Sequence, residues 1–180
     1  YDAMSVRPGG TATREDLKRD LDAIYTTGWF SGVRIEPANG PLGVQLIVKV
    51  QPNPLFKKVQ LNPYDAVVPL NVIDEIFSVD YGKTLNLNDL QLRMKELQNW
   101  YINEGYSLTR VTGPNRVTPE GQVQLNVSQG TVSGVEVQFL NKEGDAVDEN
   151  GNKIGGKTKP WVIKREISIK PGETFNRNQL

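Results

Sequence analysis

A ten-residue phrase occurs three times in this chain and constrains its fold more than any other feature. It reads PGGTATREDL at 8–17, YGKTLNLNDL at 81–90 and PGETFNRNQL at 171–180. Each copy has a Gly, a Thr two positions later, a polar residue suited to a helix N-cap, and a final Leu. The phrase therefore predicts a turn followed by a helix start, and its recurrence predicts a chain built from copies of one small unit.

Sequence similarity extends beyond the phrase. Residues 72–90 align without gaps with 162–180, and residues 4–17 align with 77–90. We therefore expect the C-terminal part of repeat one at 1–53, a complete repeat two at 54–129, and the N-terminal part of repeat three at 130–180. The apolar spacing in a complete repeat predicts a strand, a short helix, a longer helix and two more strands. The predicted fold class is α+β, in which each repeat is a three-stranded sheet covered by two helices on one face.

The individual elements follow from the same spacing. An apolar stripe of Leu90, Met94, Leu97 and Tyr101 predicts the longer helix of repeat two, and Leu17, Leu21 and Ile24 predict its counterpart in repeat one. Gly28 and Gly105 suit the C-caps of these helices. Short helices are expected near 69–78 and 160–168. Strands are expected at 29–35, 44–50, 56–62, 106–111, 123–127 and 132–140, and turns at 37–43 and 113–121.

Composition offers little material for catalysis. The 180 residues include no His and no Cys, and 21 basic residues balance 21 acidic ones. The absence of His removes the commonest general base and metal ligand, and the balanced charge argues against a nucleic-acid binder. We therefore expect no catalytic residue, no metal, no cofactor and no enzyme activity. Aromatic residues gather near the helix-to-strand corners, where we expect them to close the core: Trp29, Phe30, Trp100, Tyr101 and Tyr106.

Repeat three carries an insertion of about fourteen residues within 141–159. Asn150-Gly151 predicts a type I′ turn in it. Residues 151–158 match the pattern of a phosphate-binding loop, but polar residues separate them from the preceding strand and Lys159-Pro160 interrupts the exit. Counting from Asp148, the sixth position of a calcium loop is Lys153 instead of Gly. A solvated acidic hairpin is the better interpretation, although long loops are often functional.

The predicted architecture itself suggests a binding mode. The edge of a sheet presents unpaired backbone N–H and C=O groups, to which an extended peptide adds as another strand. We expect such binding along the second strand of each repeat, at Val33, Arg34 and Ile35 and at Leu108, Thr109, Arg110 and Val111. A scaffold arm whose contacts are purely structural is the alternative, and a capped or lysine-guarded edge would favour it.

The element order, the tandem recurrence and the glycine–aromatic corners resemble the POTRA (polypeptide-transport-associated) domain. Gly28-Trp29-Phe30-Ser31-Gly32-Val33 is similar to one form of the family's corner, and Gly105-Tyr106 to another. The trailing Val-Gln-Leu-Ile-Val-Lys-Val-Gln-Pro of repeat one resembles the end of a POTRA strand that runs into the next domain. The resemblance covers essentially the whole chain and is strongest to cyanobacterial or plastid-type members of the outer-membrane β-barrel assembly family, whose bacterial member is BamA.

The resemblance implies a soluble arm at the periplasmic face of the outer membrane. The arm would precede a membrane β-barrel in the full-length chain, receive unfolded outer-membrane proteins and guide their insertion, with periplasmic accessory proteins as possible partners. In some relatives a loop of the barrel-proximal domain lies across the pore mouth, and here that loop would present Asp148, Asn150, Gly151 and Lys153. Relatives in two-partner secretion imply a second alternative, the docking of a secreted partner.

Overall fold

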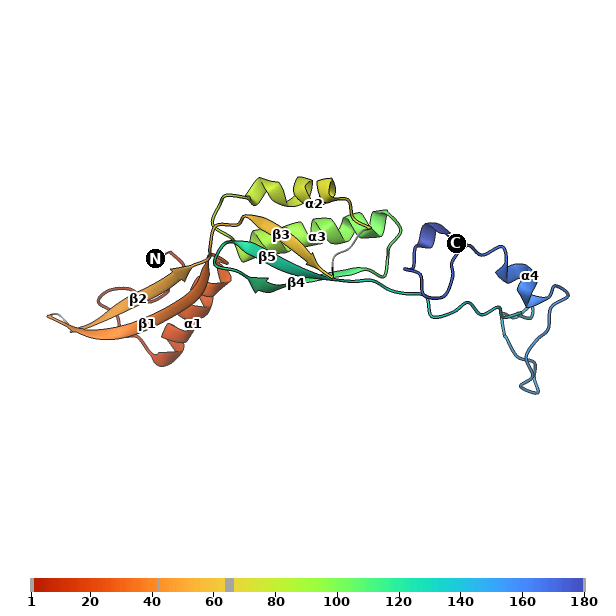
Figure 1. Ribbon diagram of the computed structural model, residues 1–180. Helices are drawn as coiled ribbons and strands as arrows, with labels where there is room; N and C mark the ends of the chain where they lie inside the picture. Colours follow the sequence, from red (N-terminus) through yellow and green to blue (C-terminus); the bar gives the residue numbers. More distant parts are fainter. Residues whose placement is uncertain (1, 42, 64–66, 180) are drawn as a thin grey trace. The chain divides into compact units, whose positions relative to one another are not determined.

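The computed structural model describes residues 2–41, 43–63 and 67–179 (Figure 1). By its internal contacts the chain divides into two compact units. One comprises Tyr1–Leu97 and Val111–Val127, and the other Gln98–Arg110 and Ser128–Leu180. Tyr1 and Leu180, the outer bounds of the predicted repeats, lie outside the described residues. Compactness does not test the repeat boundaries, so the division into three repeats stays a prediction.

The elements of repeat one are a helix and a hairpin. α1 spans Arg14–Thr26, β1 spans Phe30–Gly40 and β2 spans Gly43–Pro52. The two strands pair antiparallel, with Val33 opposite Val50 and Gly40 opposite Gly43. The turn predicted at 37–43 is therefore wrong in extent, because Pro37 lies inside β1. A strand with a free edge accommodates proline there, since the missing N–H need not serve the ladder.

Repeat two has the predicted order of elements and forms an α+β sandwich. The strands are β3 (Lys58–Asn62), β4 (Arg110–Val117) and β5 (Gln122–Ser128), and the helices are α2 (Leu70–Phe77), the 3₁₀ turn η1 (Ser78–Asp80) and α3 (Leu87–Asn103). The sheet order is β3-β5-β4, with β3 and β5 parallel. Figure 1 shows α2 and α3 on one face of this sheet.

The core of repeat two explains why its sequence folds this way. The stripe of α3 is buried as predicted, with Leu97 and Tyr101 fully inside. Val123, Leu125 and Val127 alternate into the same core from β5 and are at most 4% exposed. Burying one such aliphatic side chain contributes about 1.5–3 kcal/mol. In repeat one α1 packs against β1, and Val44, near the hairpin turn, is 69% exposed.

Repeat three contains less regular structure than predicted. α4 is limited to Pro160–Lys164, the 3₁₀ turn η2 spans Arg177–Gln179, and no strand forms at 132–140. The expected strand is wrong for a physical reason. In repeat two the corresponding strand, β3, pairs with β5, and the described residues 129–179 include no strand equivalent to β5. The alternation of half-buried and exposed side chains nevertheless persists from Val135 to Leu140.

Candidate functional site

The edge of β4 is the first place where the predicted peptide site can be examined. β4 lies at the end of the sheet order, so β5 is its one neighbour in the sheet. Arg110 and Val111 belong to β4, whereas Leu108 and Thr109 precede it. The predicted strand at 106–111 therefore begins four residues too early. Pro114 lies within β4 and not in a turn, as proline is tolerated in an edge strand.

Leu108 and Thr109 face different surroundings. The side chain of Leu108 is 55% exposed, whereas Thr109 is buried. The N–H of Thr109 donates to Tyr106 O at 3.1 Å, and its carbonyl accepts from Gln98 Nε2 at 2.6 Å. Its Oγ1 is buried and has no hydrogen-bond partner among the described residues. Both backbone groups of Thr109 thus serve the fold, and Leu108 and Arg110 are the exposed members of this set.

The edge of β1 carries the other predicted set, Val33, Arg34 and Ile35. All three lie in β1, which pairs with β2 on one side. The N–H of Val33 donates to the hydroxyl of Tyr25 at 3.0 Å. Sequence reasoning missed Tyr25, which lies on α1 next to Ile24 but outside the apolar stripe. A tyrosine near the C-terminus of the covering helix was the available signal.

A third edge, that of β3, was also missed. β3 lies at the opposite end of the sheet order from β4. The N–H of Val59 donates to the hydroxyl of Tyr81 at 3.4 Å, and the two residues before Val59, Lys57 and Lys58, are exposed. Burial raises the pKa of Tyr81 above its ordinary value, against the lowering effect of the Val59 hydrogen bond. Tyrosine hydroxyls therefore occupy outward N–H groups on two different sheet edges.

The insertion of repeat three brings the predicted loop residues into one hairpin. The N–H of Asp148 donates to Asn152 O and the N–H of Gly151 donates to Asp148 O, each at 2.9 Å. Gly151 has φ +79°, but no non-glycine residue in the described chain has positive φ, so the predicted type I′ turn at Asn150-Gly151 is wrong. The Asp148 carboxylate favours a type I turn with a bulge instead, because its Oδ1 accepts the N–H groups of Asn150 and Asn152. These hydrogen bonds also lower the pKa of Asp148.

The hairpin borders a hollow of about 510 Å³ lined mainly by apolar side chains, including Val137, Phe139, Val147 and Ile154. Lys153 lines it and pairs with Glu136 at 3.7 Å. Residues 151–158 form no phosphate loop here, because α4 begins only at Pro160 and has five residues. Among the described residues, no group of three His, Cys, Asp or Glu side chains could hold a metal ion.

The repeated phrase ties the helices of successive repeats end to end. Asn86 Nδ2 donates to Thr27 O at 3.0 Å, beyond the last turn of α1, while Asn86 Oδ1 accepts the Asn88 N–H at 2.8 Å in the first turn of α3. Gly28 lies against this contact with φ +78°, and a Cβ there would lie 2.6 Å from Asn86 Oδ1. We call this arrangement the asparagine joint.

The same joint recurs after α3. Asn176 Nδ2 donates to Glu104 O at 2.9 Å and Asn176 Oδ1 accepts the Asn178 N–H at 2.8 Å. Gly105 has φ +93°, and a Cβ at Gly105 would clash with Asn176 Oδ1, as a Cβ at Gly28 would clash with Asn86 Oδ1. The first joint is reinforced by Asn53, whose Nδ2 donates to Gly28 O and Leu85 O, both at 2.9 Å. The phrase therefore does more than turn the chain between two helices of one repeat, which is all that the sequence suggested.

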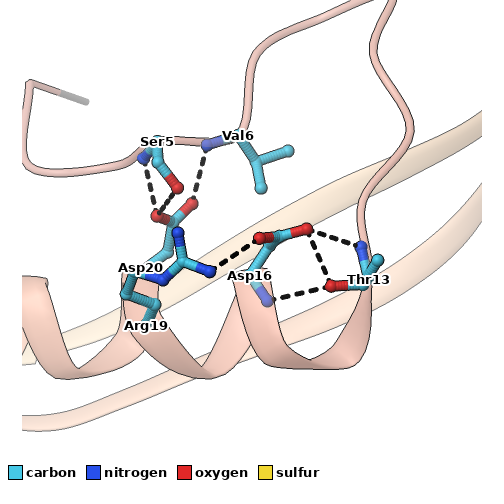
Figure 2. Close-up of polar contacts among 6 residues, drawn as sticks. All are labelled: Ser5, Val6, Thr13, Asp16, Arg19 and Asp20. Atoms are coloured by element: carbon cyan, nitrogen blue, oxygen red, sulfur yellow. Dashed lines mark hydrogen bonds and ion pairs between the residues drawn. The ribbon is translucent and has the colours of Figure 1, made fainter.

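The first copy of the phrase has Thr13 at the position of the joint asparagine, and Thr13 forms a capping box with Asp16. Thr13 Oγ1 accepts the Asp16 N–H at 3.2 Å and Asp16 Oδ2 accepts the Thr13 N–H at 3.1 Å (Figure 2). One turn further, the buried Asp20 carboxylate accepts the N–H groups of Ser5 and Val6 (Figure 2). In repeat two the aligned helix position is Arg93, which bonds to Asp80 at 2.9 Å. The segment before the phrase is therefore bound by a carboxylate of α1 in repeat one and by a guanidinium of α3 in repeat two.

The hollow beside the first joint is smaller, about 230 Å³, and Trp29, Phe56, Asn86 and Asp89 contribute to its wall. Trp29 is 42% exposed, so its predicted place in the core is wrong, whereas Tyr101 is fully buried as expected.

Within the described ranges, no helix is long and apolar enough to cross a bilayer.

Comparison with known proteins identifies the family. A model of the POTRA domain, ShlB-type, matches residues 55–130. The POTRA1-3 region of the periplasmic domain of Omp85 from Anabaena superimposes with a TM-score of 0.88 and 44% sequence identity, over 99% of this chain and 72% of that one. The N-terminal domain of Omp85 from Thermosynechococcus elongatus gives 0.78 and 37%, over 99% and 73%.

A plastid relative extends the similarity at lower identity. Outer envelope protein 80, chloroplastic, of Oryza sativa subsp. japonica is 25% identical over 174 residues, which cover 97% of this chain. This chain spans about a quarter of that relative's length, 25%. The predicted resemblance to cyanobacterial and plastid-type members, and the predicted α+β fold class, are both confirmed. The chain belongs to the Omp85 family and carries POTRA domains.

Proposed function

We propose that this chain is the periplasmic arm of an outer-membrane protein assembly or translocation channel. The arm receives unfolded outer-membrane proteins as extended segments, holds them by strand addition at its sheet edges and guides them to a membrane β-barrel of the same full-length chain. It performs no chemistry and needs no cofactor. Membership of the Omp85 family supports this role, and periplasmic accessory proteins are further candidate partners.

The single observation that favours strand addition is the position of β4. A strand with one neighbour directs half of its backbone groups away from the sheet, and these groups are the template that an added strand needs. Leu108 and Arg110 lie exposed at the start of this edge and would contact alternate side chains of the added segment. The same reasoning applies to Val33–Ile35 on β1, where Tyr25 occupies one donor.

Amide chemical-shift mapping with a matched pair of peptides tests the proposal. The probe is a ten-residue peptide with the alternating apolar and polar residues of an outer-membrane β-strand. The control has the same side chains but is N-methylated at every second amide, so it cannot form one ladder of backbone hydrogen bonds. We expect shifts in β4 for the first peptide and loss of binding for the second. Equal binding of both peptides, or shifts confined to the helices, would contradict strand addition.

The guarded edges favour a second candidate, a purely structural scaffold arm. Tyrosine hydroxyls accept the N–H groups of Val33 and Val59, and two exposed lysines, Lys57 and Lys58, lie at the start of β3. Lysines and blocked donors are among the devices by which proteins prevent edge association. This candidate predicts that no extended peptide binds at any edge, while truncation of a repeat still alters the assembly of the channel.

A further inference from the structure

We propose that the Tyr25 hydroxyl is a gate on the outer edge of β1, and that an extended segment adds to this edge only by displacing it. The inference rests on the proposed function and assigns a regulatory residue to the same site. Its occupant is an extended polypeptide whose backbone carbonyl takes the place of the tyrosine oxygen on the Val33 N–H.

The register of the hairpin identifies which backbone groups face outward. Residues opposite each other in an antiparallel pair alternate between hydrogen-bonded and non-hydrogen-bonded positions. Gly40 and Gly43 close a two-residue turn, and seven residues earlier Val33 lies opposite Val50. The bond from the Val33 N–H to Tyr25 places Val33 in the non-hydrogen-bonded set. Val33, Ile35 and Pro37 therefore direct their backbone groups away from β2.

Donors are scarce along this stretch of the edge, which makes the tyrosine decisive. Pro37 has no N–H, so Val33 and Ile35 supply the outward donors between the bulge near Gly32 and Pro37. Tyr25 already accepts one of the two. A strand added in register would recover both donors only after the hydroxyl had moved away.

The tyrosine is not required for packing of the repeat. Its side chain is 45% exposed, whereas its neighbour Ile24 is 7% exposed and fills the core. Repeat two has Ile102 at the matching helix position, three residues before its joint glycine, so the fold accepts a side chain without a hydroxyl there. An exposed side chain can swing away on a nanosecond timescale, as a gate requires.

Tyr25→Phe removes the gate and leaves the ring. The unmodified ten-residue peptide described above is titrated into the wild-type chain and the variant, and the amide shifts of Val33 and Ile35 report binding at this edge. Loss of one competing hydrogen bond predicts about a five- to tenfold tighter binding to the variant. Tyr81→Phe, which removes the cap on β3, is the matched control and should leave binding at β1 unchanged.

The outcomes separate the gate from the receiving function. Equal affinity of the two proteins at β1 would overturn the gate while strand addition stands. Binding to neither protein would overturn both. Unchanged amide positions outside β1 and α1 in the variant establish that it is folded, and faster hydrogen exchange at Val33 establishes that the cap has been removed.

Discussion

Asn53→Ala tests how strongly the asparagine joint holds repeat one to repeat two. The side chain is 8% exposed, and its Nδ2 donates to two carbonyls, those of Gly28 and Leu85, each at 2.9 Å. Gly28 O keeps a second donor in the substituted chain, the N–H of Leu87 at 3.0 Å. The loss therefore comprises two net hydrogen bonds and leaves the Leu85 carbonyl short of its side-chain donor.

The magnitude follows from these contacts. Two net hydrogen bonds contribute about 1–3 kcal/mol, and a buried acceptor without a partner adds about 1 kcal/mol or more. We expect Asn53→Ala to lower the free energy of unfolding by about 2–4 kcal/mol. Urea denaturation followed by far-UV circular dichroism measures this change, with the slope of the transition showing whether the unfolding remains one cooperative event.

A matched control separates the joint from a general effect of removing an amide. Asn103→Ala deletes an exposed asparagine near the end of α3 and should change the free energy of unfolding by less than about 0.5 kcal/mol. If Asn53→Ala were as mild as Asn103→Ala, the joint would hold nothing, and the reasoning from its hydrogen bonds would be refuted.

Three further predictions address other parts of the chain. Gly105→Ala should destabilise the second joint by more than about 1 kcal/mol in the same denaturation assay, because Gly105 has φ +93° and Asn176 Oδ1 lies where a Cβ would be; an unchanged midpoint would contradict this. Thr109→Val should raise the free energy of unfolding by about 1 kcal/mol, since it replaces a buried hydroxyl without a described partner by a methyl group of similar shape, and a loss of stability would show that the hydroxyl has a partner. Burial disfavours the charged form of Asp20, but hydrogen bonds from Ser5 and Val6 outweigh it and hold its pKa below the ordinary 3.8. This contribution to stability is complete above that value and is lost as pH falls through the lower folded pKa, so the Val6 amide should lose protection from exchange only below about pH 4, and Asp20→Asn should remove the pH dependence.

Local patterns in the sequence predicted most of the fold. The stripe of Leu90, Met94, Leu97 and Tyr101 predicted both α3 and its buried face. Residues three or four positions apart lie on the same face of a helix, so an apolar stripe at this spacing identifies the face that packs against the core. The alternation of Val123, Leu125 and Val127 did the same for β5. The wrong predictions concern segments whose structure depends on which strands pair with each other. Sequence predicts turns at Pro37 and Pro114, because it cannot show that their strands lie at the edge of a sheet, where a proline is tolerated. Residues 132–140 pair with no strand among the described residues.

The candidate site was predicted less completely than the fold. Sequence located Val33–Ile35 and Arg110–Val111 on the second strands, and the sheet order places β4 at an edge. It could not locate Tyr25 or Tyr81, because their bonds to Val33 and Val59 join elements whose distance is set only by packing. It also assigned Thr109 to an exposed strand, although the turn after α3 buries it.

The sequence alone determined the recurring phrase, the order of elements within residues 54–129 and the family resemblance, since these depend on local spacing and on recurrence along the chain. Tertiary structure decided what the repeated asparagines do. Asn86 and Asn176 are ordinary helix caps by sequence, and the carbonyls of Thr27 and Glu104 become their partners only when two helix ends meet. A hydrogen bond between residues 59 or 72 positions apart leaves no local trace in composition or period, because it forms only when the fold brings the end of one helix next to the start of another.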